Sequence, residues 1–168
     1  MIVDTSLFIV TGVSGAGKTN VAQKLCMIID SDFDVYDMDL ILEDYGQFIE
    51  VGKVWLKIAY WNAEKGRHTI LCGSMPDYHL TEQDLFSEFK HIYYCYLTCS
   101  DEVRAKRLAA RAGAWTMENI QFANDWDHAL KAQAMNSIPP ISVIDTTLTT
   151  AEQTAETIWK WVKKTMES

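Results

Sequence analysis

Several common features are scarce or missing in this sequence of 168 residues. It contains only three prolines, and it has no linker, low-complexity tract or internal repeat. No apolar run reaches the roughly 18 residues that a membrane-spanning helix needs. The first residues lack the basic segment and apolar core of a secretion signal. We therefore expect a cytoplasmic protein that forms one domain over 1–168 and has no membrane partner.

Positive charge is also scarce. The chain has 15 lysines and arginines against 23 acidic residues, which gives a net charge of −8. Nucleic-acid binding over a broad surface requires clustered Lys and Arg, so we do not expect a nucleic-acid partner. A site for phosphate groups would have to gather the few cations in one place.

Metal-binding and disulfide patterns are missing as well. The four cysteines, at positions 26, 72, 95 and 99, include no CxxC pair. This spacing predicts buried free thiols rather than a zinc site or a disulfide.

Apolar strands and amphipathic helices alternate along the chain. We predict strands at 6–11, 33–36, 68–72, 91–98 and 141–144, and helices at 18–29, 40–65, 80–90, 101–112, 117–135 and 150–166. The alternation predicts an α/β fold with three αβα layers, in which helices cover both faces of a five-stranded parallel sheet.

One motif carries specific chemistry. The segment GVSGAGKT at 12–19 matches GxxxxGK[ST], between a predicted strand and a predicted helix. Glycines let successive backbone N–H groups point at a phosphate, and the helix N-terminus adds positive charge. Lys18 can reach the β- and γ-phosphates, and Thr19 can offer its hydroxyl to Mg²⁺. We assign the nucleotide to Gly12, Ser14, Gly15, Ala16, Gly17, Lys18, Thr19 and Asn20. A glycine-rich turn without a ligand, or a nucleotide-binding loop without catalysis, are the alternatives.

With this motif the chain resembles the P-loop NTPases. The DxxG and NKxD motifs of Ras-like GTPases are missing. The chain looks more like the small-molecule kinases of the shikimate, gluconate and adenylate kinase type. This resemblance implies ATP as donor and Mg²⁺ as cofactor, and we expect the strand order 2-3-1-4-5.

Two carboxylates follow the second predicted strand, at Asp37 and Asp39. Strand ends of such sheets face the same crevice as the phosphate loop. A carboxylate there can hold Mg²⁺ through water or accept the proton of an attacking hydroxyl. The pair looks like the DxD of shikimate kinases. We prefer Asp37 as the catalytic carboxylate and as a metal ligand with Thr19. The alternatives are a solvated acidic turn and a helix-capping role for Asp39.

Arg107 and Arg111 share one face of the helix predicted at 101–112. By resemblance to nucleotide kinases, Arg107 contacts the base, while Arg111 holds the phosphates during catalysis. Arg104 could substitute, and a solvated basic face is the alternative. The same resemblance places the backbone groups of Thr146 and Thr147, after the last strand, beside the adenine. A start of the last helix at Thr147 or Thr149 is equally compatible.

The acceptor site is expected along 40–66. This segment has many aromatic residues and no arginine, although arginine normally clamps an anionic acceptor. A neutral hydroxyl compound fits it better, and we assign Asp37, Asp39, Trp61 and Ser74 to the acceptor. Ordinary core packing is the alternative for the aromatic residues. A short lid is expected at about 112–116.

Together these features predict an ATP- and Mg²⁺-dependent phosphotransferase that moves the γ-phosphoryl group to a nucleoside, sugar or similar alcohol. The alternatives are a nucleoside monophosphate kinase and an ATP-binding NTPase without a small-molecule acceptor. The sequence does not predict the oligomeric state.

Overall fold

A computed structural model describes residues 2–41, 48–74, 84–113 and 115–167. Its centre is a five-stranded parallel sheet in the order β2-β3-β1-β4-β5, so the predicted fold class and strand order are confirmed. The strands are β1 Val3–Thr11, β2 Phe33–Asp37, β3 His68–Gly73, β4 Phe89–Thr98 and β5 Ser142–Asp145.

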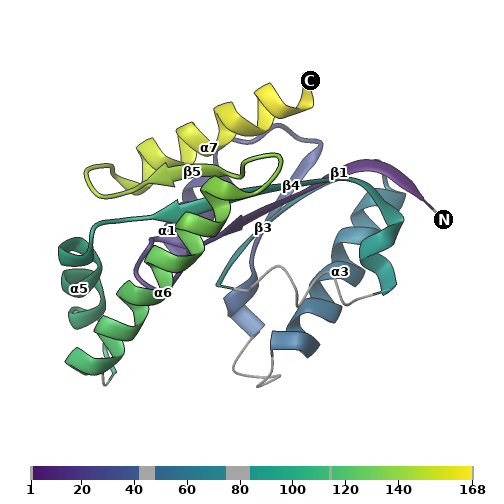
Figure 1. Ribbon diagram of the computed structural model, residues 1–168. Helices are drawn as coiled ribbons and strands as arrows, with labels where there is room; N and C mark the ends of the chain where they lie inside the picture. Colours follow the sequence, from purple (N-terminus) through teal and green to yellow (C-terminus); the bar gives the residue numbers. More distant parts are fainter. Residues whose placement is uncertain (1, 42–47, 75–83, 114, 168) are drawn as a thin grey trace.

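Helices cover both faces of the sheet (Figure 1). One face carries α1 (Lys18–Leu25) and α7 (Ala151–Met166), and the other carries α3 (Phe48–Glu64) and α6 (Met117–Asn136). The fifth helix, α5 (Asp101–Ala109), follows β4. Short 3₁₀ helices, η1 (Met38–Ile41) and η2 (Asp84–Glu88), complete the described elements.

The central strand explains why both faces must be covered. Residues 7–10 of β1 are fully buried, with Phe8 and Val10 in the cluster beneath α1 and α7. Leu7 and Ile9 lie in the cluster beneath α3. Alternate side chains of a strand point to opposite faces, so this continuous apolar run requires helices on both sides.

Some predicted boundaries are wrong. The first helix ends at Leu25 rather than near 29, and the chain continues in tight turns. Of the helix predicted at 80–90, residues 84–88 form η2 and β4 begins at Phe89, while 75–83 lie outside the described residues. Leu85 and Phe86 pack against the α3 cluster, which accounts for their apolar character without a helix.

The last helix begins with a capping box. The Thr150 hydroxyl accepts the Gln153 N–H, and the Gln153 side chain accepts the Thr150 N–H. Such a box satisfies two backbone donors that a helix start leaves open. The start proposed at Thr147 or Thr149 is therefore wrong.

The cysteine prediction is correct for three residues. Cys72, Cys95 and Cys99 are buried free thiols, and burial raises the pKa of Cys95 to about 12. Cys26 is also free, but it is exposed. Among the helices that the structure describes, none has the length and apolar character to cross a membrane.

Candidate phosphoryl-transfer site

The loop that joins β1 to α1 holds the candidate site. Gly15 and Gly17 have φ values of 88° and 96°, a region that favours glycine. A β-carbon on Gly15 would also lie only 2.9 Å from Cγ of Arg104. Gly17 begins α1 without a side-chain cap, so the first N–H groups of the helix are not bonded to a capping side chain. This is the backbone arrangement that the motif predicted.

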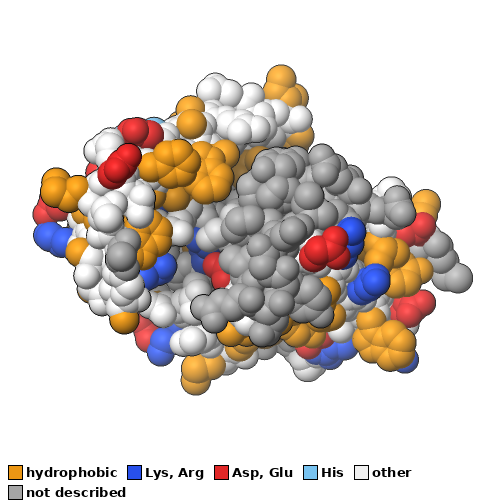
Figure 2. All heavy atoms as spheres, turned by 90° about the horizontal axis from the view of Figure 1, so that it is seen from below, with side chains coloured by type: hydrophobic (Ala, Val, Ile, Leu, Met, Phe, Trp, Pro, Cys, Tyr) orange, Lys and Arg blue, Asp and Glu red, His pale blue; other side chains and the backbone are white. Residues whose placement is uncertain are grey.

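A cavity of about 700 Å³ lies over this loop. It brings together most of the residues assigned to nucleotide binding, which come from the loop, α1, η1, α5 and the segment after β5. The lining includes Gly15, Ala16, Gly17, Thr19, Asn20, Asp39, Arg107, Arg111 and Thr146. Seen from below, basic and acidic side chains gather in a hollow of the surface (Figure 2). Of the 15 lysines and arginines, Arg107 and Arg111 line this cavity, and Lys18 lies beside it.

Lys18 is the buried cation beside this cavity. Its side chain is 5% exposed, and its Nζ donates a hydrogen bond to the Val13 carbonyl at 3.1 Å. Burial lowers the pKa of Lys18 to about 8, although the nearby carboxylates of Asp39 and Asp37 oppose this shift. The ammonium group has lost much of its hydration, so a phosphate anion would stabilise its charged form.

Arg104 does not line the cavity, so the expectation that it could substitute for Arg107 or Arg111 is wrong. The side chain is fully buried and forms an ion pair with Asp127 of α6 at 2.6 Å. It also donates to the Ser14 carbonyl at 2.9 Å. The Ser14 carbonyl is therefore bound by Arg104 on the interior side of the loop, and Ser14 is not among the residues that line the cavity.

Asp127 completes a buried network that sequence reasoning missed. Its carboxylate accepts hydrogen bonds from the Tyr96 hydroxyl at 2.9 Å and from Thr98 Oγ1 at 2.7 Å. The network connects α6, β4 and, through Arg104, the phosphate loop. A signal was present in the sequence, because Asp127 shares a helix face with Ala123 and Leu130, both in the apolar cluster around Val13.

Arg107 reaches the cavity and also braces the loop. Its guanidinium donates to the Gly15 carbonyl at 3.0 Å and to the Thr146 carbonyl at 2.8 Å. The Thr146 N–H donates to the Thr98 carbonyl at 2.8 Å. Both backbone groups of Thr146 are thus used within the protein, contrary to the expectation that they contact adenine. Arg111, one turn later, is exposed and lines the same cavity.

The two carboxylates after β2 have different surroundings. Asp37 is buried, and its Oδ1 accepts the Asp39 N–H at 3.0 Å, which starts the short helix η1. Asp39 lines the cavity with Thr19, and its carboxylate lies 3.4–3.5 Å from the backbone N and Oγ of Ser74. The capping role proposed for Asp39 therefore belongs to Asp37, and Asp39 is the carboxylate that faces the cavity.

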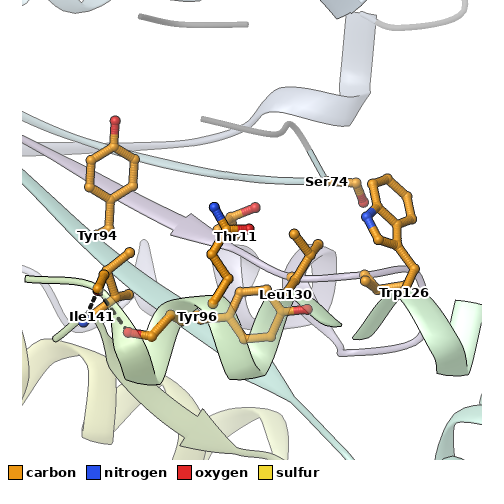
Figure 3. A pocket seen from close by; sticks show the side chains of 12 residues that line it. Thr11, Ser74, Tyr94, Tyr96, Trp126, Leu130 and Ile141 are labelled. Atoms are coloured by element: carbon orange, nitrogen blue, oxygen red, sulfur yellow. Dashed lines mark hydrogen bonds between the residues drawn. The ribbon is translucent and has the colours of Figure 1, made fainter. Parts of the chain in front are cut away.

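A second cavity, of about 340 Å³, lies between α6 and the ends of β1 and β4 (Figure 3). Ser74 lines it, as does Gly12, which does not line the first cavity. A β-carbon on Gly12 would lie 2.4 Å from the Leu97 carbonyl oxygen, so close strand packing requires glycine there. Trp61 lines neither cavity: it is 61% exposed, with the Lys65 ammonium 4.7 Å from its ring centre. The acceptor role expected for Trp61 has no support in this placement.

Comparison with solved structures identifies the fold. The chain is similar to a sugar kinase from a Janibacter species, with a TM-score of 0.60, 21% identity and 95% of each chain covered. It is similar to the tunicamycin resistance protein of Deinococcus radiodurans, with a TM-score of 0.66, 14% identity and coverage of 94% of this chain and 95% of that chain. It is also similar to shikimate kinase from Acinetobacter baumannii, with a TM-score of 0.59, 20% identity and coverage of 96% and 94%. No protein-family model matches the sequence, and a comparison with curated proteins finds no match. The chain therefore has the fold of P-loop small-molecule kinases.

Proposed function

We propose that this protein transfers the γ-phosphoryl group of ATP, with Mg²⁺, to a hydroxyl group of a small molecule. One observation carries the proposal. A single cavity beside the buried Lys18 combines the glycine loop, the guanidinium groups of Arg107 and Arg111, and the carboxylate of Asp39. A protein with a net charge of −8 gathers these cations where a polyphosphate would need them.

The residues fit both ATP and Mg²⁺. Lys18 and the loop N–H groups would stabilise phosphate charge, and Arg111 would hold the phosphates from the open side of the cavity. The Thr19 hydroxyl and the carboxylate oxygens of Asp39 and Asp37 are the hard donors that suit Mg²⁺. When bound, Mg²⁺ supplies charge neutralisation at the β- and γ-phosphate oxygens.

The acceptor hydroxyl would be handled by a carboxylate. Asp39 faces the cavity and can orient this hydroxyl and accept its proton, while Asp37 fixes the turn that presents Asp39. Residues 112–116, of which Ala114 lies outside the described residues, would close as a short lid; Trp115 packs against the apolar cluster of Val13, Leu108 and Ala123. Closure would exclude water and limit ATP hydrolysis.

The proposal is tested by ADP formation with and without candidate hydroxyl acceptors. We expect slow basal turnover that one class of compound stimulates, and a rise in Tm with ATP and Mg²⁺. Lys18→Ala should abolish transfer. Lys24→Ala is the matched control on the same helix, where an exposed pair with Glu152 at 2.8 Å is lost, and it should retain activity. Rapid phosphate release without any acceptor would favour the NTPase alternative, and no rise in Tm would refute nucleotide binding.

A further inference from the structure

The smaller cavity, beneath α6, differs from the first in its chemistry. Among the described residues, none of those that line it is charged. Its apolar surface comes from Tyr94 and Tyr96 of β4, Trp126 and Leu130 of α6, and Ile141 (Figure 3). Its volume of about 340 Å³ lies within the range of about 300–1,000 Å³ that is usual for small-molecule sites.

Two residues connect this cavity to the phosphoryl-transfer site. Val13 lines the smaller cavity, and its carbonyl accepts the hydrogen bond from Lys18 Nζ. Ser74 also lines it, and Asp39, which lies beside Ser74, lines the larger cavity. A compound in the smaller cavity would thus have one end near the phosphate loop and near the carboxylate proposed to accept its proton.

The arginines of the chain leave no clamp for an anionic acceptor. Arg67 is bound to Asp34 through two hydrogen bonds of 2.6 and 2.7 Å. Arg104 is buried in its ion pair, and Arg107 and Arg111 belong to the nucleotide cavity. Among the described residues, no arginine therefore lines the smaller cavity, and a carboxylate or phosphate placed there would lose hydration without gaining a cationic partner.

On the basis of the proposed function, we infer that the smaller cavity beneath α6 binds the non-reacting part of the acceptor, which is an uncharged hydroxyl compound with a flat apolar ring. The ring lies among Tyr94, Trp126 and Leu130, and the reacting hydroxyl lies at the Ser74 end. The acceptor site is therefore formed by β4 and α6 rather than by Trp61 of α3.

The test uses compounds that separate the effect of charge from that of the aromatic ring. Phenyl β-D-glucopyranoside is neutral with a phenyl ring, phenyl β-D-glucuronide carries a carboxylate in place of the C6 hydroxymethyl group, and methyl β-D-glucopyranoside lacks the phenyl ring. Thymidine and thymidine monophosphate form a second pair, and a wider panel of neutral and anionic ring-bearing alcohols extends them. Calorimetry with a non-hydrolysable ATP analogue and Mg²⁺ should show at least tenfold tighter binding of neutral ring compounds. Equal or tighter binding of the anionic members, or no binding of any neutral ring compound, overturns the inference.

Variants of α6 locate the binding. Trp126→Ala should weaken binding of the neutral ring compound at least fivefold, and Leu130→Trp should abolish it by filling the cavity. Met135→Ala is the control: Met135 of α6 is 59% exposed and does not line the cavity. Both α6 variants should keep the rise in Tm with ATP and Mg²⁺, which shows that they fold. If both Trp126→Ala and Leu130→Trp bind the neutral ring compound as tightly as the parent protein does, the acceptor binds elsewhere.

The two proposals can fail separately. If the neutral ring compound binds in a Trp126-dependent way but no compound stimulates ADP formation, the phosphotransferase proposal fails and the cavity assignment stands. If an acceptor stimulates ADP formation and its KM is unchanged in Trp126→Ala and Leu130→Trp, the cavity assignment fails and the phosphotransferase proposal stands.

Discussion

The two cavities on either side of the phosphate loop have opposite chemistry. The larger is lined by Arg107, Arg111 and Asp39, while the smaller has no charged residue in the part of its lining that the structure describes. They meet at the loop itself, where the Val13 carbonyl and the Lys18 ammonium form a hydrogen bond. The larger cavity is thus suited to a polyanion and the smaller to a neutral molecule, although only a few residues separate them.

The largest expected effect lies at the junction of the cavities. Asp39→Asn should lower kcat by about 10²–10⁴-fold, because the amide cannot accept the proton of the acceptor hydroxyl. Asp37→Asn should lower kcat less, since an amide oxygen can still accept the Asp39 N–H. Steady-state kinetics with the identified acceptor tests both, and the Tm of each variant with ATP and Mg²⁺ controls for folding. A larger loss in Asp37→Asn would restore the preference for Asp37 that the sequence suggested.

The charged cavity could largely be predicted from the sequence, because several of its parts carry a recognisable local pattern, although they come from separate segments. The loop at 12–19 is contiguous, and helical spacing puts Arg107 and Arg111 on one face. The same spacing could not say that Arg104 faces the protein interior, because that depends on how α5 docks against Asp127. The spacing also could not predict which of Asp37 and Asp39 faces the cavity. That depends on the conformation of η1, in which the Asp37 carboxylate accepts the Asp39 N–H.

The neutral cavity could not be predicted, because it exists only after distant segments pack. The alternation of strands and helices was sufficient for the parallel sheet, and the resemblance to P-loop kinases supplied its order. The cavity, however, joins Thr11, Ser74, Tyr94 and Trp126 from four separate elements or loops. The aromatic residues of 40–66 indicated an acceptor site along that segment instead. Of these, Trp55 packs into the core beneath α3, as the packing alternative for that segment proposed.

The buried network of Arg104, Asp127, Tyr96 and Thr98 should contribute strongly to the stability of the fold. Asp127→Ala leaves Arg104 buried without its carboxylate, which should cost about 3–5 kcal/mol of unfolding free energy. Urea unfolding measures the loss. Asp101→Ala is the control, since it removes an exposed contact with His128 and should cost at most about 1 kcal/mol.

A double replacement separates charge from packing in this network. Arg104→Met with Asp127→Leu removes both charges and should recover part of the stability that Asp127→Ala loses. Because the Ser14 carbonyl then loses the Arg104 donor, the double variant should still bind ATP more weakly than the parent protein. Equal losses in Asp127→Ala and Asp101→Ala would show that the buried pair is not a support of the loop.

The smallest expected effect is a difference in pH response between the cavities. The pKa of Lys18 is lowered to about 8, so the free protein loses this charge as the pH rises above 8. Phosphate binding favours the charged form, and Kd for ATP with Mg²⁺ should rise about tenfold between pH 7 and 9. Lys18→Arg keeps its charge over this range and should show a flat profile.

The free energy of unfolding should change with pH in the opposite direction. The unfolded chain holds the Lys18 proton up to about pH 10.5, so the stability of the nucleotide-free protein should increase relative to Lys18→Arg from pH 8 upward.

The neutral cavity should show no such response. The described residues of its lining include no charged group, so the affinity for a neutral ring compound, measured without nucleotide, should be constant from pH 7 to 9. Calorimetry with each ligand in turn on one protein preparation gives both profiles. A parallel decline of the two would mean that Lys18 contacts both ligands, and the two cavities would then form a single site. If only the affinity for ATP falls with pH, the loop separates two sites. The larger cavity then binds its ligand through charge, and the smaller cavity binds its ligand through shape and apolar contact.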